Sequence, residues 1–260
     1  MAEELNRIVE HIHDYQNYLI STVGLQQDFL GRDWLKEQAD AVKNRKDDKV
    51  SYLFTRLFWQ GFVTSKILPA NFGQGVNKIY QMLRNQYKNL TFDHDVNKRF
   101  FWKRQDDFEG LWSELILLDY FTSQGITSEP NLGKRRFDIV VTQGDTQYRI
   151  EVKAIIHGND GEFLNSRFES FLLDDKPALR LRRAFRSKAK QLGKTRQAAI
   201  AIDISLYYDP VIKILAGMVT NSLGKGFNSQ IRSLKYRADL PVILFLRDPY
   251  TGLAAGCLVL

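Results

Sequence analysis

The sequence predicts an α/β protein in which an all-helical N-terminal region precedes a core with a central mixed β-sheet flanked by helices. Three observations predict this fold. Apolar residues recur at helical spacing up to about residue 100, they alternate every second residue after Pro130, and helix-like and strand-like segments then follow one another. We therefore divide the chain into an N-terminal region, residues 1–100, and a core domain, residues 101–260.

The N-terminal region is expected to hold about four helices. Leu5, Ile8 and Ile12, for example, share one helical face. The segment 69–75 contains one proline and two glycines and should separate two of these helices. No helix-turn-helix or zinc-finger signature is visible, so the region is expected to serve substrate recognition, homodimerisation or both.

The core is expected to begin with a strongly amphipathic helix over 108–121, which Gly125 ends. Two strands should follow, with Gly144-Asp145 between them as the two central residues of a type II′ hairpin turn. The remaining elements are predicted to be a helix at 178–192, a buried strand at 198–204, a helix at about 228–236, and strands at 242–246 and 253–260.

The predicted hairpin brings three charged residues together. With Gly144 and Asp145 at the turn, Asp138 lies directly opposite Glu151, and Lys153 is on the same face of the strand as Glu151. Opposed carboxylates with Cβ atoms about 4.5–5.5 Å apart destabilise a sheet. A divalent cation would compensate, because magnesium prefers a few carboxylate oxygens together with waters and substrate phosphate. The alternative is an ordinary solvated ladder of surface charges.

Glu114 is a further candidate on the preceding helix. It lies three residues after Leu111 and four before Leu118, so it emerges beside the apolar stripe of that helix. A carboxylate near the core boundary is costly unless it is paired or binds a metal. The alternative to a functional role is a buried acid paired with an arginine.

The chain has a helical acid, Glu114, then Asp138 on one strand, and then Glu151-Val152-Lys153 on the next strand. This order of residues resembles the PD-(D/E)xK nuclease superfamily, which includes restriction endonucleases and Holliday-junction resolvases, over about residues 108–205. The resemblance implies a restriction-endonuclease-like core and a magnesium site, with manganese able to substitute. It implies that Asp138, Glu151 and the main-chain carbonyl of Val152 are metal ligands and that Lys153 positions the attacking water. Glu114 matches a helical acid of many members, as a further ligand or a support. The chain departs from the motif at one position, because Phe137 stands where the P of PD-(D/E)xK would place a proline before Asp138.

A basic segment follows the hairpin. Residues 176–196 contain nine Lys and Arg and no Asp or Glu, so a polyanionic partner is favoured over a merely solvated face. The residues expected to contact nucleic acid are Arg180, Arg182, Arg183, Arg186, Lys188, Lys190, Gln191 and Lys194. Gln191 is included through the resemblance, because some subfamilies of these nucleases place a glutamine near the site.

Composition sets the remaining expectations. Net charge is +7 and the pI about 9.3, which favours nucleic acid as partner. A single cysteine, no membrane-length apolar run and no signal-peptide pattern predict a cytoplasmic protein without a membrane partner. The expected function is magnesium-dependent endonucleolytic cleavage of DNA, restriction-type or otherwise defence-related. The alternatives are a toxin-like nuclease that cleaves transfer RNA, and a nucleic-acid-binding protein with an inactive nuclease fold.

Overall fold

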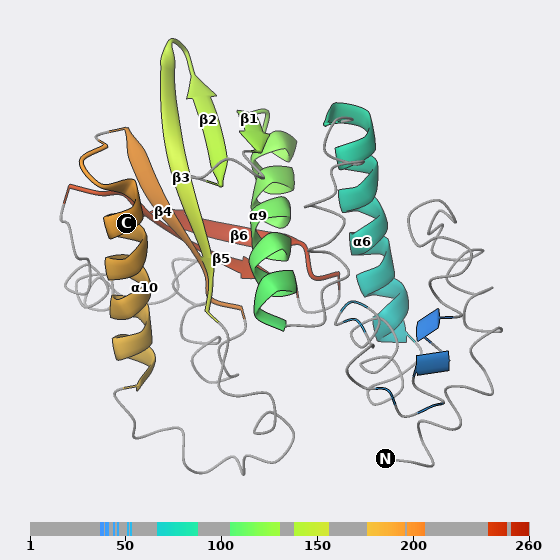
Figure 1. Ribbon diagram of the computed structural model, residues 1–260. Helices are drawn as coiled ribbons and strands as arrows, with labels where there is room; N and C mark the ends of the chain where they lie inside the picture. The colour runs from blue at the N-terminus through green and yellow to red at the C-terminus, as the bar shows by residue number, and fades with distance from the viewer. Residues whose placement is uncertain are drawn as a thin grey trace. The chain divides into compact units, whose positions relative to one another are not determined.

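The computed structural model describes residues 67–87, 105–130, 138–155, 176–195, 197–205, 239–248 and 251–259, and eight separate positions between 37 and 53. The chain divides into two compact units. The first comprises Met1–Trp112 and Asp248–Leu253, and the second comprises Ser113–Arg247 and Ala254–Leu260. The elements are labelled in Figure 1.

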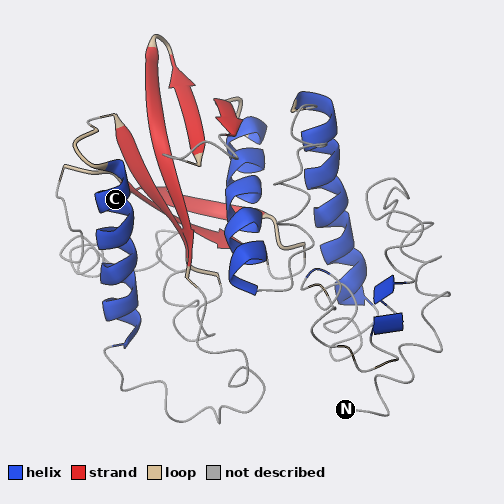
Figure 2. Ribbon diagram, viewed as in Figure 1, coloured by secondary structure: helices blue, strands red, loops and turns tan. Residues whose placement is uncertain are grey.

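The second unit contains a six-stranded mixed sheet whose strands lie in sequence order (Figure 2). Antiparallel pairing joins the first three strands, parallel pairing joins β3 to β4 and β4 to β5, and β6 returns antiparallel to β5. The strands are β1 (Thr127–Pro130), β2 (Ile139–Gln143), β3 (Thr146–Ala154), β4 (Ala198–Asp203), β5 (Val242–Arg247) and β6 (Ala254–Val259). An α/β fold with a mixed sheet is therefore confirmed.

Two helices cover opposite faces of this sheet, α9 (Gln105–Ser123) and α10 (Lys176–Leu192). The even-numbered residues of β4 and β5, such as Ile202 and Leu244, share a buried cluster with Phe185 of α10. Neighbours along a strand point to opposite faces, and Asp203 and Arg247 bond Ser113 of α9. Hence α10 packs on the even face of β4 and β5, and α9 on the odd face (Figure 1).

The register of the hairpin agrees with the predicted turn. Gln143 pairs with Thr146, and the ladder continues to Ile139 opposite Ile150. Gly144 has a φ of 57°, the positive value that a primed hairpin turn requires at its first central residue. The local turn residues therefore determined which side chains of β2 and β3 are neighbours.

The first unit contains α6 (Ile67–Gln86) and the first half of α9. In α6, Val76, Ile79 and Leu83 recur at helical spacing and are buried. In α9, the indole Nε1 of Trp112 donates to the carbonyl of Gly252 at 2.9 Å. This bond joins α9 to the turn that precedes β6.

The expected break at 69–75 was wrong, because α6 runs through it as one helix. Pro69 lies in the first helical turn, where its missing N–H would have no intrahelical partner. Gly75 has a packing role, since a Cβ there would collide with the main-chain carbonyl of Thr251. The expectation of about four helices concerns residues that otherwise lie mostly outside the described ranges.

Two further expectations differ from the structure. Strand β1 was not anticipated, because its four residues are too few to display an alternating pattern. Helix α9 lacks the expected solvated face, since Glu109, Ser113 and Asp119 are buried along with its apolar residues. The expected helix at 228–236 lies outside the described residues. No helix in the described part of the chain is long and apolar enough to cross a membrane.

Candidate functional site

Asp138 immediately precedes β2 and is attached to β3 by two hydrogen bonds. Its main-chain N–H donates to the carbonyl of Ile150 at 3.0 Å. Its carboxylate Oδ2 accepts the main-chain N–H of Val152 at 2.7 Å. A carboxylate held by a backbone donor has a fixed position, so Asp138 is oriented before any ligand is present.

Glu151 lies in β3 and faces α10. It is in register with Ile200 of β4, which belongs to the buried cluster under α10, and residues in register on neighbouring strands point to the same face. The residue is only 4% exposed. Burial and then the nearby charge of Asp138 raise the pKa of Glu151, and Lys188 opposes this shift without cancelling it.

Lys188 of α10 is the cation that joins the two acids. Its Nζ lies 2.7 Å from Glu151 Oε2 and 3.5 Å from Asp138 Oδ2. Burial alone would lower the pKa of this lysine, but the charges of Asp138, Glu151 and Glu114 outweigh burial and raise it. The lysine therefore stays protonated over the whole physiological pH range, and its charge partly balances the acids.

Glu114 lies on α9, the helix that covers the face of the sheet opposite to α10. Glu114 is only 7% exposed, and its negative charge is one of those that raise the pKa of Lys188. The structure therefore brings Glu114 into electrostatic range of Lys188.

Lys153 lies two residues after Glu151 on the same face of β3, in register with Ile202. The side chain is exposed. Among the described residues, the cation in contact with both carboxylates is Lys188, and Lys153 forms no ion pair with either of them. Val152 between them is buried. Phe137 lies outside the described residues.

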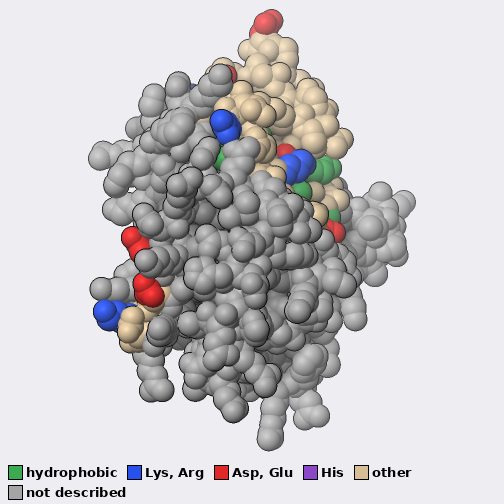
Figure 3. All heavy atoms as spheres, turned by 90° about the vertical axis from the view of Figure 1, so that its right-hand side faces the viewer, with side chains coloured by type: hydrophobic (Ala, Val, Ile, Leu, Met, Phe, Trp, Pro, Cys, Tyr) green, Lys and Arg blue, Asp and Glu red, His purple; other side chains and the backbone are tan. Residues whose placement is uncertain are grey.

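The basic segment forms α10, whose cations lie on two sides. Lys188 is on the packed side, three residues after buried Phe185 and four before buried Leu192. The exposed residues are Arg183, Arg186, Lys190, Gln191 and, just after the helix, Lys194. The side chains of Arg180 and Arg182 lie outside the description. Figure 3 draws another face of the molecule, on which the described Lys and Arg side chains lie in separate places.

The two hairpin carboxylates fit a divalent cation. Both converge on one position, which the Nζ of Lys188 occupies, and magnesium commonly uses one or two carboxylates with waters and substrate phosphate. The described residues contain no group of three or more His, Cys, Asp or Glu that could hold a metal ion. The two carboxylates that meet at this position are therefore those of Asp138 and Glu151.

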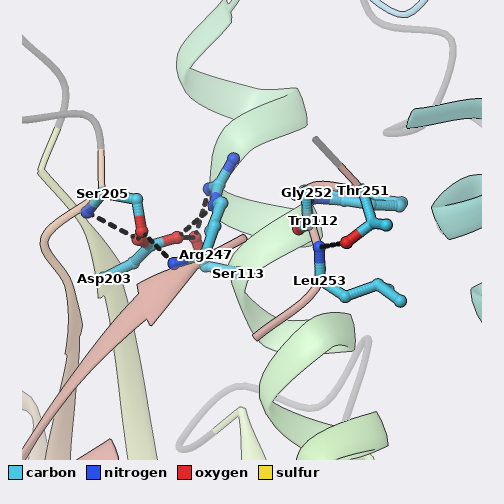
Figure 4. A network of polar contacts seen from close by, with 8 residues as sticks. All are labelled: Trp112, Ser113, Asp203, Ser205, Arg247, Thr251, Gly252 and Leu253. Atoms are coloured by element: carbon cyan, nitrogen blue, oxygen red, sulfur yellow. Dashed lines mark hydrogen bonds and ion pairs between the residues drawn. The ribbon is translucent and has the colours of Figure 1, made fainter. Parts of the chain in front are cut away.

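A second buried polar cluster was missed by the sequence reasoning (Figure 4). Asp203 Oδ2 accepts from Arg247 Nε at 2.6 Å and from the hydroxyl of Ser113 at 2.7 Å. Its Oδ1 accepts from the main-chain N–H and the hydroxyl of Ser205, at 3.0 and 2.6 Å. Each Asp203 oxygen thus has two donors, so the cluster is satisfied and fastens α9 to the sheet.

The signal for this cluster was present in the sequence. An acid ends the apolar strand 198–203 and an arginine ends the apolar strand 242–247. Since the carboxyl ends of parallel strands lie at one edge of a sheet, the two charges could have been paired from the pattern alone.

Comparisons of the chain with protein-family models, curated proteins and solved structures found no match.

Proposed function

We propose that this protein is a metal-dependent endonuclease of the PD-(D/E)xK type that hydrolyses phosphodiester bonds in DNA. The observation that carries the proposal is the convergence of Asp138 and Glu151 on one cation at the end of the hairpin. In this proposal the mixed sheet is a restriction-endonuclease-like core. The N-terminal region recognises substrate or forms a homodimer, and the protein acts in the cytoplasm as a restriction-type or other defence enzyme.

Asp138, Glu151 and the main-chain carbonyl of Val152 would hold magnesium, or manganese in its place. Such an ion supplies positive charge that polarises a phosphate oxygen and acidifies a water. Asp138 is well suited to this role because the N–H of Val152 fixes its carboxylate. Glu114 adds negative charge from α9 and supports the ligands indirectly.

Lys153 and the exposed face of α10 complete the proposed site. Lys153 is exposed beside the acids, so its ammonium can meet a substrate from the solvent side and orient a water or stabilise charge on the phosphate. The outward residues Arg183, Arg186, Lys190 and Lys194 bind the sugar-phosphate backbone through charge, independently of base sequence. Chemistry and binding are thus assigned to neighbouring parts of one βα unit.

A cleavage assay tests the proposal. Wild type is incubated with duplex DNA, single-stranded DNA and transfer RNA, each with Mg²⁺, Mn²⁺ or chelator. We expect metal-dependent cleavage of DNA, and its loss by at least about a hundredfold in Asp138→Asn and Lys153→Met. Asp145→Asn is the matched control, because it removes one acid from the exposed hairpin turn. If transfer RNA is cleaved and neither form of DNA is, the substrate is RNA and the assignment of DNA is wrong.

A second candidate function is nucleic-acid binding by an inactive nuclease fold. It is favoured by one observation, the occupation of the position between the acids by Lys188. Under this alternative, gel-shift binding to duplex DNA persists in chelator and none of the three nucleic acids is cleaved with either metal. Metal-dependent cleavage that survives in Asp145→Asn and disappears in Asp138→Asn excludes it.

A further inference from the structure

Lys188 differs from the other cations of α10 in where its charge lies. Its side chain is 14% exposed, and the Glu151 side chain that it contacts at 2.7 Å is 5% exposed. Arg183 and Lys190 of the same helix are exposed. The ammonium of Lys188 is therefore committed to the acid pair and does not belong to the outward, phosphate-facing charge of the helix.

The ammonium and a divalent cation need the same oxygens. Glu151 Oε2 and Asp138 Oδ2 both point at Nζ of Lys188, and these two carboxylates are the side-chain ligands assigned above. A lysine ammonium is a compact point charge on a flexible four-carbon stem, so it can imitate a small ion and can also swing away. Two cations held by the same oxygens repel each other strongly.

The helix position of Lys188 makes such a movement feasible. Its stem leaves the packed side of α10 between Phe185 and Leu192, which are 1% and 5% exposed. Long lysine stems can remain on apolar surface while the charged head moves to water. Release of the ammonium therefore requires side-chain rotation and no unpacking of the helix.

We propose that Lys188 is a built-in counter-ion that a divalent cation must displace, so that lysine and metal exchange at the Asp138–Glu151 pair. This inference rests on the proposed function for the identity of the metal site. In the metal-free protein Lys188 keeps the two acids together and partly neutralised. Metal binding is weaker by the free energy of the contact between Lys188 and the two carboxylates. The metal therefore replaces the ammonium only when the concentration of free ion is high enough, or when an arriving substrate phosphate adds further ligands for the metal.

The first test measures Mn²⁺ affinity by titration calorimetry at constant pH and ionic strength. Lys188→Met keeps the length of the stem and removes the ammonium, whereas Lys190→Met makes the same change at an exposed position of the same helix. We expect Mn²⁺ to bind Lys188→Met at least about tenfold more tightly than wild type, and Lys190→Met within about twofold of it. Equal or weaker binding by Lys188→Met, or no Mn²⁺ binding by any form, overturns the inference.

The second test uses the unaltered protein and stands even if Lys188→Met fails to fold. Wild type is acetylated briefly with an amine-reactive ester, with and without saturating Mn²⁺, and labelling is read at each lysine by mass spectrometry. Displacement predicts a several-fold rise in labelling of Lys188 with Mn²⁺ and no change at Lys190. Unchanged labelling of Lys188 contradicts displacement.

These measurements separate the inference from the proposed function. If wild type cleaves DNA but Lys188→Met and wild type bind Mn²⁺ equally, the exchange is wrong and the nuclease assignment stands. If Mn²⁺ displaces Lys188 but no nucleic acid is cleaved under any condition, the exchange stands and the nuclease assignment is wrong.

Discussion

Replacing Arg247 by methionine should destabilise the protein without altering the chemistry of the candidate site. The Arg247 side chain is 4% exposed; its Nε donates to Asp203 at 2.6 Å, and its Nη2 donates to the Ser113 hydroxyl at 3.0 Å. Methionine keeps much of the apolar stem but leaves the Asp203 carboxylate, which is fully buried, without its opposite charge. The perturbation is therefore electrostatic and local to the junction of α9, β4 and β5.

The expected loss follows from what Asp203 keeps. Removing one partner of a buried ion pair costs about 3–5 kcal/mol. Asp203 retains three hydrogen bonds, from the Ser113 hydroxyl and from the N–H and hydroxyl of Ser205. These donors place the cost at the low end, about 3 kcal/mol. For a protein of this size that loss lowers the melting temperature by about 6–12 °C.

Urea unfolding followed by circular dichroism measures the loss, with Lys190→Met as a control that should stay within about 0.5 kcal/mol of wild type. Adding Asp203→Asn to Arg247→Met removes the uncompensated charge and should recover at least about 1 kcal/mol. A loss below about 1 kcal/mol in Arg247→Met, or a double variant less stable than the single one, refutes this account of the cluster.

Three further outcomes are expected. The pKa of Glu151 is raised in the folded state, so protonation of Glu151 adds to the free energy of unfolding. That added stability is fully present below the pKa that Glu151 has in the unfolded chain, and it is lost as pH rises through the pKa that Glu151 has in the folded protein. Urea unfolding in chelator should then show Glu151→Gln gaining on wild type from pH 4 to pH 7, and a constant difference contradicts this linkage. Replacing Arg183 and Arg186 by glutamine should reduce the log–log salt slope of duplex binding by about 0.9 for each phosphate that these arginines neutralise, whereas an unchanged slope means a solvated face. Burial raises the pKa of Cys257 to about 12, so at pH 8 roughly one thiol in ten thousand is ionised, and folded protein should react with iodoacetamide far more slowly than urea-unfolded protein.

The sequence by itself determined the hairpin and the acids on it. Alternation of apolar residues, together with Gly144 at a turn that needs positive φ, determined the register of β2 and β3. That register placed Asp138 beside Glu151. These features were readable because each depends on residues close together in the chain, where backbone sterics and strand periodicity decide the outcome.

Only the tertiary structure decided which cation neutralises those acids. Lys153 is close to Glu151 in sequence and on the same face of the strand, yet Lys188 makes the contact from α10. Likewise, glycine at position 75 is required by the carbonyl of Thr251, far along the chain. Helical spacing shows which side of a helix is apolar, but which strand it packs against depends on the summed burial of many side chains. A contact between residues distant in sequence is therefore determined only when the layers pack.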